Sequence, residues 1–233
     1  MSRTIQDRFT LLNGRIKAAC RNCNRNPEEI SLIAVSKTKP DEDVRALMDA
    51  GQVHFGENRV QALTKRFETL NDPAVQWHFI GTLQTNKIKY MAHRVNWIQS
   101  VHKSKALVEI DRRALEAGRV INTLIQVNIS QEDQKSGCEP EELPGLLKQA
   151  QQMKHLRVLG LMGMATFTDD PEKVRPEFRI LRSLRDEHLF MNEGSVNLKH
   201  LSMGMTNDLE VAVEEGSTML RVGTAIFGSR NYG

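Results

Sequence analysis

The feature that most constrains the fold is an alternation of short apolar stretches with amphipathic ones, which continues along almost the whole chain. The apolar stretches predict strands, and the segments between them carry the apolar period of helices. Strands are predicted at residues 31–37, 53–56, 76–80, 97–101, 121–129, 156–162, 198–202 and 219–227. Helices are predicted between them at residues 41–50, 59–70, 86–93, 104–117, 140–153, 171–188 and 207–215, and a leading helix at 4–25.

Strands that alternate with helices at this spacing form parallel βαβ units. Eight such units in 233 residues, with no break in composition, favour one closed (β/α)8 TIM barrel. We therefore expect an α/β fold with a single domain over residues 1–233. An open doubly wound sheet is the alternative topology.

The composition is that of an ordinary globular protein, with 39% hydrophobic and 26% charged residues. The net charge is +3 and the basic residues are spread along the chain, so no nucleic-acid partner is expected. The amino terminus has no apolar signal core, and no apolar run is long enough to span a bilayer. We expect a cytoplasmic protein without a membrane partner, and a monomer by default, since the sequence does not reveal the oligomeric state.

Three cysteines, Cys20, Cys23 and Cys138, are too few for a disulfide framework in a chain of this size. The spacing of Cys20 and Cys23 suggests redox or zinc chemistry, but the pair falls near the end of a predicted helix. No second pair or histidine cluster supplies the remaining ligands of a zinc site. We expect no metal, and the role of this pair stays open.

The first predicted strand ends with a lysine. Residues 33–40 read IAVSKTKP, and the proline cannot continue a strand ladder. Strand alternation would place Lys37 on the same side as Ile33 and Val35, at the carboxyl end of the strand. An amine in this position suits a Schiff base, because an apolar surround or a second cation such as Lys39 favours its neutral, reactive form. A solvated lysine at a strand end is the alternative.

Two further stretches lie where barrels of this kind bind phosphate, after strands seven and eight. In the first, Ser202 and a glycine turn precede a helix that we expect Thr206 to cap. In the second, Gly223 permits close backbone approach and Thr224 adds a hydroxyl. An anion site on the same rim as a strand-end lysine fits a phosphate cofactor that carries an aldehyde. Arg221 is either a surface arginine or barrel-mouth ion pair, or a partner of the cofactor's ring nitrogen, where it would disfavour a protonated ring.

Five motifs in the chain resemble the pyridoxal phosphate homeostasis protein family. They are AVSKTKP at 34–40, FGEN at 55–58, WHFIG at 77–81, LSMGM at 201–205 and RVGTAIFG at 221–228. The resemblance runs from about residue 30 to the carboxyl terminus. It implies a barrel like the amino-terminal domain of alanine racemase, with pyridoxal 5'-phosphate (PLP) as the cofactor. The roles that it implies are a Schiff base at Lys37, a phosphate site at Ser202, Gly223 and Thr224, a ring-nitrogen contact at Arg221, and Asn58 beside the ring.

The same resemblance implies a non-catalytic carrier or regulator in vitamin B6 homeostasis, with PLP-dependent apoenzymes as possible recipients of the cofactor. Racemases of this barrel type use a second base, a tyrosine from an additional β domain, whereas this chain ends just after strand eight. Its tyrosines, Tyr90 in a predicted helix and Tyr232 in the tail, are not evident candidates. A PLP-dependent racemase or decarboxylase is the alternative, and a barrel that binds a phosphorylated metabolite without PLP is a third hypothesis.

Several other residues have less specific signals. His78 lies in an apolar strand, where a hydrogen-bonded core histidine is more frequent than a ligand contact. Lys135 follows strand five and is either a secondary amine site or a solvated loop lysine. Of the carboxylates Glu57, Asp208 and Glu210, the last two are expected to be acids at the start of a helix.

Overall fold

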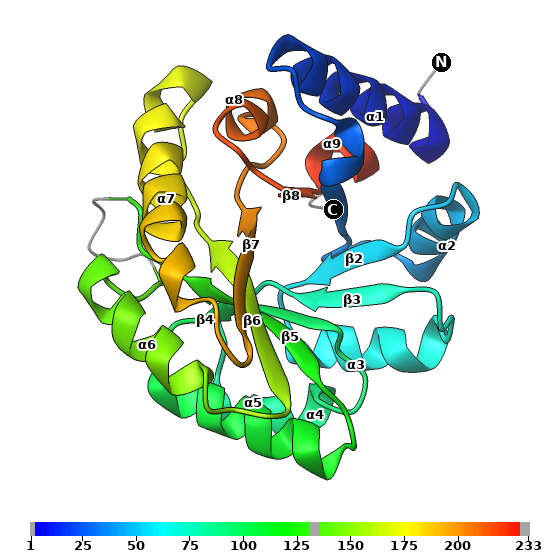
Figure 1. Ribbon diagram of the computed structural model, residues 1–233. Helices are drawn as coiled ribbons and strands as arrows, with labels where there is room; N and C mark the ends of the chain where they lie inside the picture. The colour runs from blue at the N-terminus through cyan, green and yellow to red at the C-terminus, as the bar shows by residue number, and fades with distance from the viewer. Residues whose placement is uncertain (1–2, 131–135, 229–233) are drawn as a thin grey trace.

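The computed structural model describes residues 3–130 and 136–228, and in it eight parallel strands close into a barrel in the order β1 to β8, with β8 paired to β1 (Figure 1). This is the predicted (β/α)8 architecture, and the open sheet is excluded. The strands are β1 (Ser31–Val35), β2 (His54–Glu57), β3 (Gln76–Phe79), β4 (Trp97–Val101), β5 (Ile121–Gln126), β6 (Leu156–Met162), β7 (Val196–Ser202) and β8 (Met219–Val222).

The helices surround the strands (Figure 1). They are α1 (Ile5–Asn22), α2 (Asp41–Asp49), α3 (Val60–Thr69), α4 (Ile88–Met91), α5 (Ser104–Glu116), α6 (Leu143–Ala150), α7 (Arg175–Glu187), α8 (Leu209–Glu214) and α9 (Thr224–Phe227). Five single 3-10 turns accompany them: η1 (Pro27–Glu29), η2 (Thr85–Lys87), η3 (Pro140–Glu142), η4 (Pro171–Val174) and η5 (Leu189–Met191). In the described part of the chain, no helix is both long and apolar enough to cross a membrane.

The leading helix α1 packs against α8 and α9, on the outside of the barrel (Figure 1). Thr4 caps it, with a side-chain oxygen that accepts from the Asp7 amide. Arg8 donates to the carbonyl of Ile226 in α9 at 2.6 Å. Arg15 forms an ion pair with Glu210 of α8 at 2.9 Å. The first helix therefore supports the elements that follow β7 and β8.

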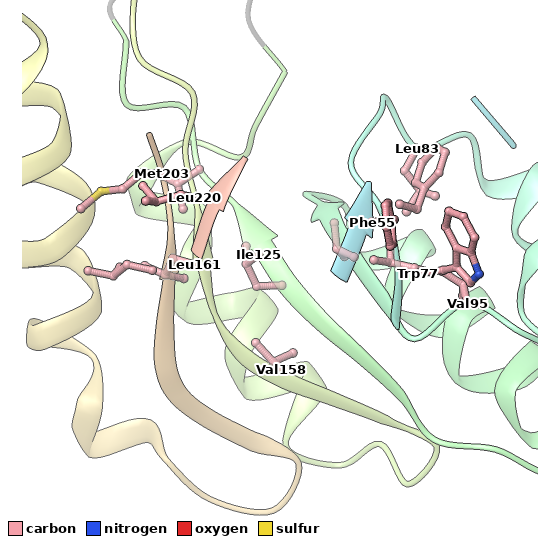
Figure 2. Close-up of a cluster of buried hydrophobic side chains, with 14 of the residues drawn as sticks. Phe55, Trp77, Leu83, Val95, Ile125, Val158, Leu161, Met203 and Leu220 are labelled. Carbon is pink, nitrogen blue, oxygen red and sulfur yellow. The ribbon is translucent and has the colours of Figure 1, made fainter. Parts of the chain in front are cut away.

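Two apolar layers hold the barrel together, because alternate residues of each strand face opposite sides. The larger layer fills the space between strands and helices. Phe55 and Trp77, with ring centroids 5.7 Å apart, belong to it, as do Leu161 and Leu220 (Figure 2). The smaller layer is a separate cluster formed by Ile33, Trp97, Leu124, Met162 and Met219. We place this second cluster inside the barrel, since Ile33 alternates with Leu32 and Ala34 of the outer layer.

The structure corrects several predicted boundaries near the carboxyl ends of the strands. The fifth strand ends at Gln126 instead of residue 129. The first strand ends at Val35 instead of Lys37, because the amide of Lys39 bonds the carbonyl of Ser36 and turns the chain. The last strand ends at Val222 instead of residue 227, and α9 follows it at once. Thr206 does not cap α8, whose N-cap residue is Asp208.

Candidate functional site

The predicted site residues all lie at or just beyond the carboxyl ends of their strands, on one rim of the barrel. The structure thereby brings together four adjacent strands, since β8 pairs with both β7 and β1, and β1 pairs with β2. The residues are Lys37 after β1, Asn58 after β2, Ser202 at the end of β7, and Arg221, Gly223 and Thr224 in and after β8.

Lys37 is half-buried and lies in the turn between β1 and α2, two residues beyond the end of the strand. Its neighbour Thr38 has a φ of 65°, and the amide of Lys39 donates to the carbonyl of Ser36 at 3.1 Å. A positive φ at the third residue is the pattern of a type II turn, where glycine is the usual residue. Lys39 is turned toward α9, where its amine donates to the carbonyls of Phe227, at 3.2 Å, and Gly228, at 3.4 Å.

Glu57 places a buried carboxyl group next to this turn. Its Oε1 accepts from the hydroxyl of Ser36 at 2.7 Å, whereas its Oε2 is buried without a hydrogen-bond partner among the described residues. Burial raises the pKa of Glu57 to about 7, although the Ser36 hydrogen bond and the charge of Lys37 both lower it. The Arg66 guanidinium touches the same oxygen at 3.4 Å. A carboxyl group that titrates near neutrality thus lies close enough to Lys37 for the charge of the lysine to lower its pKa.

Asn58 is exposed at the rim, and its backbone lies against a glycine of the loop that follows β3. A Cβ built on Gly81 would lie 2.0 Å from the carbonyl oxygen of Asn58 and 2.8 Å from its Cα. Only glycine permits so close an approach of two backbones. The motifs at 55–58 and 77–81 are therefore in contact through the backbone, which the sequence did not reveal.

The start of α9 offers donors for an anion. Within α9, the first amides bonded to helical carbonyls are those of Ile226 and Phe227, which donate to Gly223 at 3.0 and 2.9 Å. The preceding amides, those of Thr224 and Ala225, have no carbonyl within the helix to donate to. The Thr224 side chain is exposed. A Cβ on Gly223 would approach the Val35 carbonyl to 3.2 Å, so a larger residue would crowd β1.

A chain of hydrogen bonds runs from the rim into the barrel interior. Nη1 of Arg221 donates to the Ser202 hydroxyl at 2.6 Å, and this hydroxyl donates to Oε1 of Gln99 at 2.7 Å. Nε2 of Gln99 then lies 2.9 Å from Nδ1 of His78, whose Nε2 lies 3.0 Å from Nδ1 of His54. Each side chain between Arg221 and His54 in this network accepts a hydrogen bond from the one before it and donates to the next. The polar groups of the network therefore supply each other's hydrogen-bond partners.

His78 is thus the hydrogen-bonded core histidine that we considered the more frequent case. It is fully buried and stacks on Trp97, with ring centroids 5.5 Å apart. Burial lowers its pKa well below the ordinary value, so the ring is neutral. Sequence reasoning missed Gln99 and His54 because polar residues on two different strands carry no local signal of contact.

Arg221 is buried, with 5% of its surface exposed, and its Nη2 donates to the carbonyl of Gly163 at 2.9 Å. Burial lowers its pKa to about 10, and the charge of Asp208 acts in the opposite direction. The guanidinium therefore stays cationic at neutral pH. The surface-arginine alternative is excluded, since the side chain lies inside the barrel.

The remaining predicted residues lie elsewhere. Tyr90 is on α4 with 48% of its surface exposed, and the amines of Lys87 and Lys89 lie over its ring. Lys135 and Tyr232 fall outside the described residues. Asp208 and Glu210 lie at the start of α8, as predicted.

The cysteines of the described chain are free thiols. Cys20 and Cys138 are buried, and burial raises the pKa of both, that of Cys138 to about 12. Cys23 donates to helix carbonyls of α1. Within residues 3–130 and 136–228, His, Cys, Asp and Glu side chains form no group of three or more that would hold a metal ion.

A pocket of about 470 Å³ lies in the outer layer, between α3 and α4. It contains none of the predicted site residues. Its lining consists of Val60, Gln61, Thr64, Phe67, Glu68, Lys87, Tyr90, His93 and Arg94.

The residues at the rim fit a cofactor that carries both an aldehyde and a phosphate. Lys37 provides a half-buried amine, and Thr224 with the first amides of α9 provides donors on the neighbouring strand. The pairing of Ala34 with Val222 puts these two groups side by side at the rim. Arg221 adds a buried cation beneath them.

The chain is similar over nearly its whole length to proteins of known family. It matches the family described as alanine racemase, N-terminal domain, over residues 14–231. It is 43% identical to the pyridoxal phosphate homeostasis protein of Aquifex aeolicus, with 97% of this chain and 98% of that protein covered. A structure of PipY from Synechococcus elongatus with PLP bound is 34% identical, with a TM-score of 0.79 over 93% of this chain and 100% of that one. A crystal structure from Bifidobacterium adolescentis is 35% identical, with a TM-score of 0.89 and coverage of 96% and 94%.

Proposed function

The chain belongs to the pyridoxal phosphate homeostasis protein family, and we propose that it binds PLP at Lys37 and holds it as a non-catalytic carrier or regulator. The observation that carries this proposal is the placement of an amine and an anion cradle at the ends of the paired strands β1 and β8. The anion cradle consists of the Thr224 hydroxyl and the first amides of α9. The names of the relatives and the PLP bound to PipY support the identity of the cofactor. We assign the binding role to the barrel as one domain, residues 1–233.

When bound, PLP supplies an aldehyde that forms a reversible C=N bond with a neutral primary amine and releases one water. We propose that Lys37 supplies that amine and that Glu57, a buried carboxyl group with a pKa of about 7 on which the charge of Lys37 acts, exchanges a proton with it. We propose that the Thr224 hydroxyl and the first amides of α9 bind the phosphate, with Gly223 leaving room for it. Asn58 would lie beside the ring.

Ser202 and Arg221 need a separate assignment, because both already take part in the interior network. The Ser202 hydroxyl gives its only hydrogen to Gln99, so it would donate to a phosphate only after leaving that partner. Arg221 keeps its charge, and a cation at the ring nitrogen would disfavour ring protonation. We propose that Arg221 contacts the ring nitrogen and that Ser202 completes the phosphate site.

The same residues support a binding role without turnover. Removal of an α-proton needs a positioned base, and a protonated ring stabilises the resulting carbanion more strongly than a neutral ring does. Arg221 would oppose that protonation. Tyr90, the tyrosine within the described residues, lies on the outer surface and not at the rim. We therefore favour a carrier that delivers PLP to apoenzymes over a racemase or decarboxylase.

The binding assignment is tested with Lys37→Ala. The variant removes the amine but leaves the apolar residues of β1 in place, so we expect a folded barrel without the visible absorbance of lysine-bound PLP. Borohydride reduction followed by mass mapping should locate the adduct on Lys37 in the wild-type protein. The exposed Lys17 of α1 is the matched control, and Lys17→Ala should bind as the wild type does. Full absorbance in Lys37→Ala would reject the assignment.

The carrier assignment is tested by solvent deuterium exchange at the α-carbon of several amino acids, with purified protein and added PLP. We expect no exchange at enzymatic rates. Exchange at about 1 per second or faster, the range of ordinary enzymes, would establish the racemase or decarboxylase alternative instead.

A further inference from the structure

Arg66 is a buried arginine on α3 whose guanidinium reaches the turn that carries Lys37. Its side chain is 8% exposed. Nη2 donates to the carbonyls of Ser36, at 3.4 Å, and of Lys39, which are the first and last residues of the turn. Nη1 pairs with Asp41 at the start of α2, and Nε contacts Glu57 at 3.4 Å. One planar fork therefore binds both ends of a four-residue turn and the two carboxyl groups beside it.

The turn needs such support because its conformation is unfavourable in isolation. Thr38 has a φ of 65°, and a β-branched residue rarely adopts this left-handed region. Conformations of this kind persist only where the surrounding structure determines them. The hydrogen bond from the Lys39 amide to Ser36 closes the turn, and Arg66 binds the carbonyl groups of both residues.

Arg66 also takes part in the pairing of charged groups around the turn. Lys37 and Lys39 carry positive charge within the turn, and Asp41 and Glu57 flank it from α2 and β2. Arg66 is the cation that contacts both of these carboxyl groups. Without it, the buried Glu57 would lose a contact and the start of α2 would lose its ion pair.

We propose that Arg66 is a positioning residue, which fixes the turn so that the amine of Lys37 stays directed to the rim beside the start of α9. This inference rests on the proposed function, because it takes Lys37 to be the amine that reacts with the aldehyde. Arg66 itself does not touch the cofactor. Its effect passes through the backbone of residues 36–39.

The test compares Arg66→Met and Arg66→Lys with Arg45→Met. Arg45 is a matched control, because it also links α2 to α3, by a hydrogen bond to the Thr69 carbonyl, but is exposed and does not contact the turn. The first readout is hydrogen exchange of the Lys39 amide in the full-length protein without cofactor. The second is the share of borohydride-trapped PLP adduct that maps to Lys37 relative to Lys39 and Lys17.

In Arg66→Met we expect about tenfold faster exchange of the Lys39 amide and about tenfold lower selectivity for Lys37, as for the loss of hydrogen bonds from a charged group. Arg66→Lys should restore little of either, because one ammonium nitrogen cannot contact both carbonyls, Asp41 and Glu57 at once as the three guanidinium nitrogens do. Arg45→Met should change neither. Unchanged exchange and selectivity in Arg66→Met, equal effects in Arg45→Met, or wild-type behaviour of Arg66→Lys would each overturn the proposal.

If Arg66→Met does not fold, as judged by circular dichroism, Asp41→Asn provides the second test. It removes the ion pair at Nη1 of Arg66 without replacing a residue of the turn. Both readouts should therefore change in the same direction as in Arg66→Met, by a smaller factor, and no change would overturn the proposal. A wild-type protein that gives no adduct at Lys37, while the exchange still depends on Arg66, would reject the proposed function and leave the positioning of the turn supported.

Discussion

Replacement of Glu57 by glutamine should change how the stability of the barrel depends on pH. Glu57→Gln keeps an oxygen that accepts from the Ser36 hydroxyl but cannot ionise. Burial raises the pKa of Glu57 from 4.5 to about 7 in the folded chain. The folded state therefore holds the proton more tightly than the unfolded state does, and its stability falls as pH rises from 4.5 through 7.

The size of this effect follows from the two pKa values. At about 1.4 kcal/mol per pH unit, a pKa raised from 4.5 to about 7 corresponds to roughly 3 kcal/mol of unfolding free energy. The wild type should lose this amount relative to Glu57→Gln between these two pH values. Buried histidines oppose the trend, because burial lowers the pKa values of His54, His78 and His200. Their contribution is the same in both proteins and cancels in the difference.

The assay is urea unfolding of the wild type and Glu57→Gln, both without cofactor, at several pH values between about 4.5 and 8. The amide nitrogen of the glutamine replaces an unpartnered oxygen, which adds only an offset independent of pH. Glu210→Gln is the control, because Glu210 forms an exposed ion pair with Arg15 that is worth under about 1 kcal/mol. A flat difference between wild type and Glu57→Gln across this range would refute the reasoning.

Two further predictions follow from close contacts at the rim. Gly81→Ala should destabilise the barrel by about 1 to 3 kcal/mol and weaken PLP retention, because the new Cβ meets the Asn58 backbone. The control Gly14→Ala, in open space on α1, should instead stabilise the barrel by about 0.5 to 1 kcal/mol. Denaturant unfolding measures the stability and dialysis measures the retention, and equal effects of the two variants would contradict the contact. Thr224→Ala should weaken retention by about 1.5 to 3 kcal/mol without loss of stability. Ser202→Ala should lower both retention and stability, because it removes the hydroxyl that donates to Oε1 of Gln99 and accepts from Nη1 of Arg221. Unchanged retention in both variants would place the phosphate elsewhere.

The architecture was predictable because strand and helix periods are local properties of the sequence. Each predicted strand overlaps one strand of the barrel, and parallel strands share one carboxyl rim. That rule places Lys37 and Gly223 on the same rim from the sequence alone. The environment of each residue was not predictable, since a helical arginine such as Arg66 is usually solvated and nothing in its local sequence indicates a buried turn.

The end of the last strand shows why boundaries depend on tertiary contacts. Residues 224–227 read TAIF, which has the β-branched and aromatic composition of a strand. A strand at this position needs a partner, however. The last residue pair between β1 and β8 is Ala34 with Val222, and β1 ends one residue later at Val35. The chain beyond Val222 has almost nothing left to pair with, and it satisfies its amides by forming α9.

The turn after β1 therefore determines the geometry of both halves of the candidate site. It ends β1, which allows α9 to form and exposes the first amides of that helix. It also holds α9 directly, because the amine of Lys39 donates to the carbonyls of Phe227 and Gly228 at the far end of the helix. The separation between the amine of Lys37 and the anion cradle is thus set by one short segment. It follows that a variant which loosens this turn, such as Arg66→Met, should weaken the binding of the phosphate as well as the reaction of the amine.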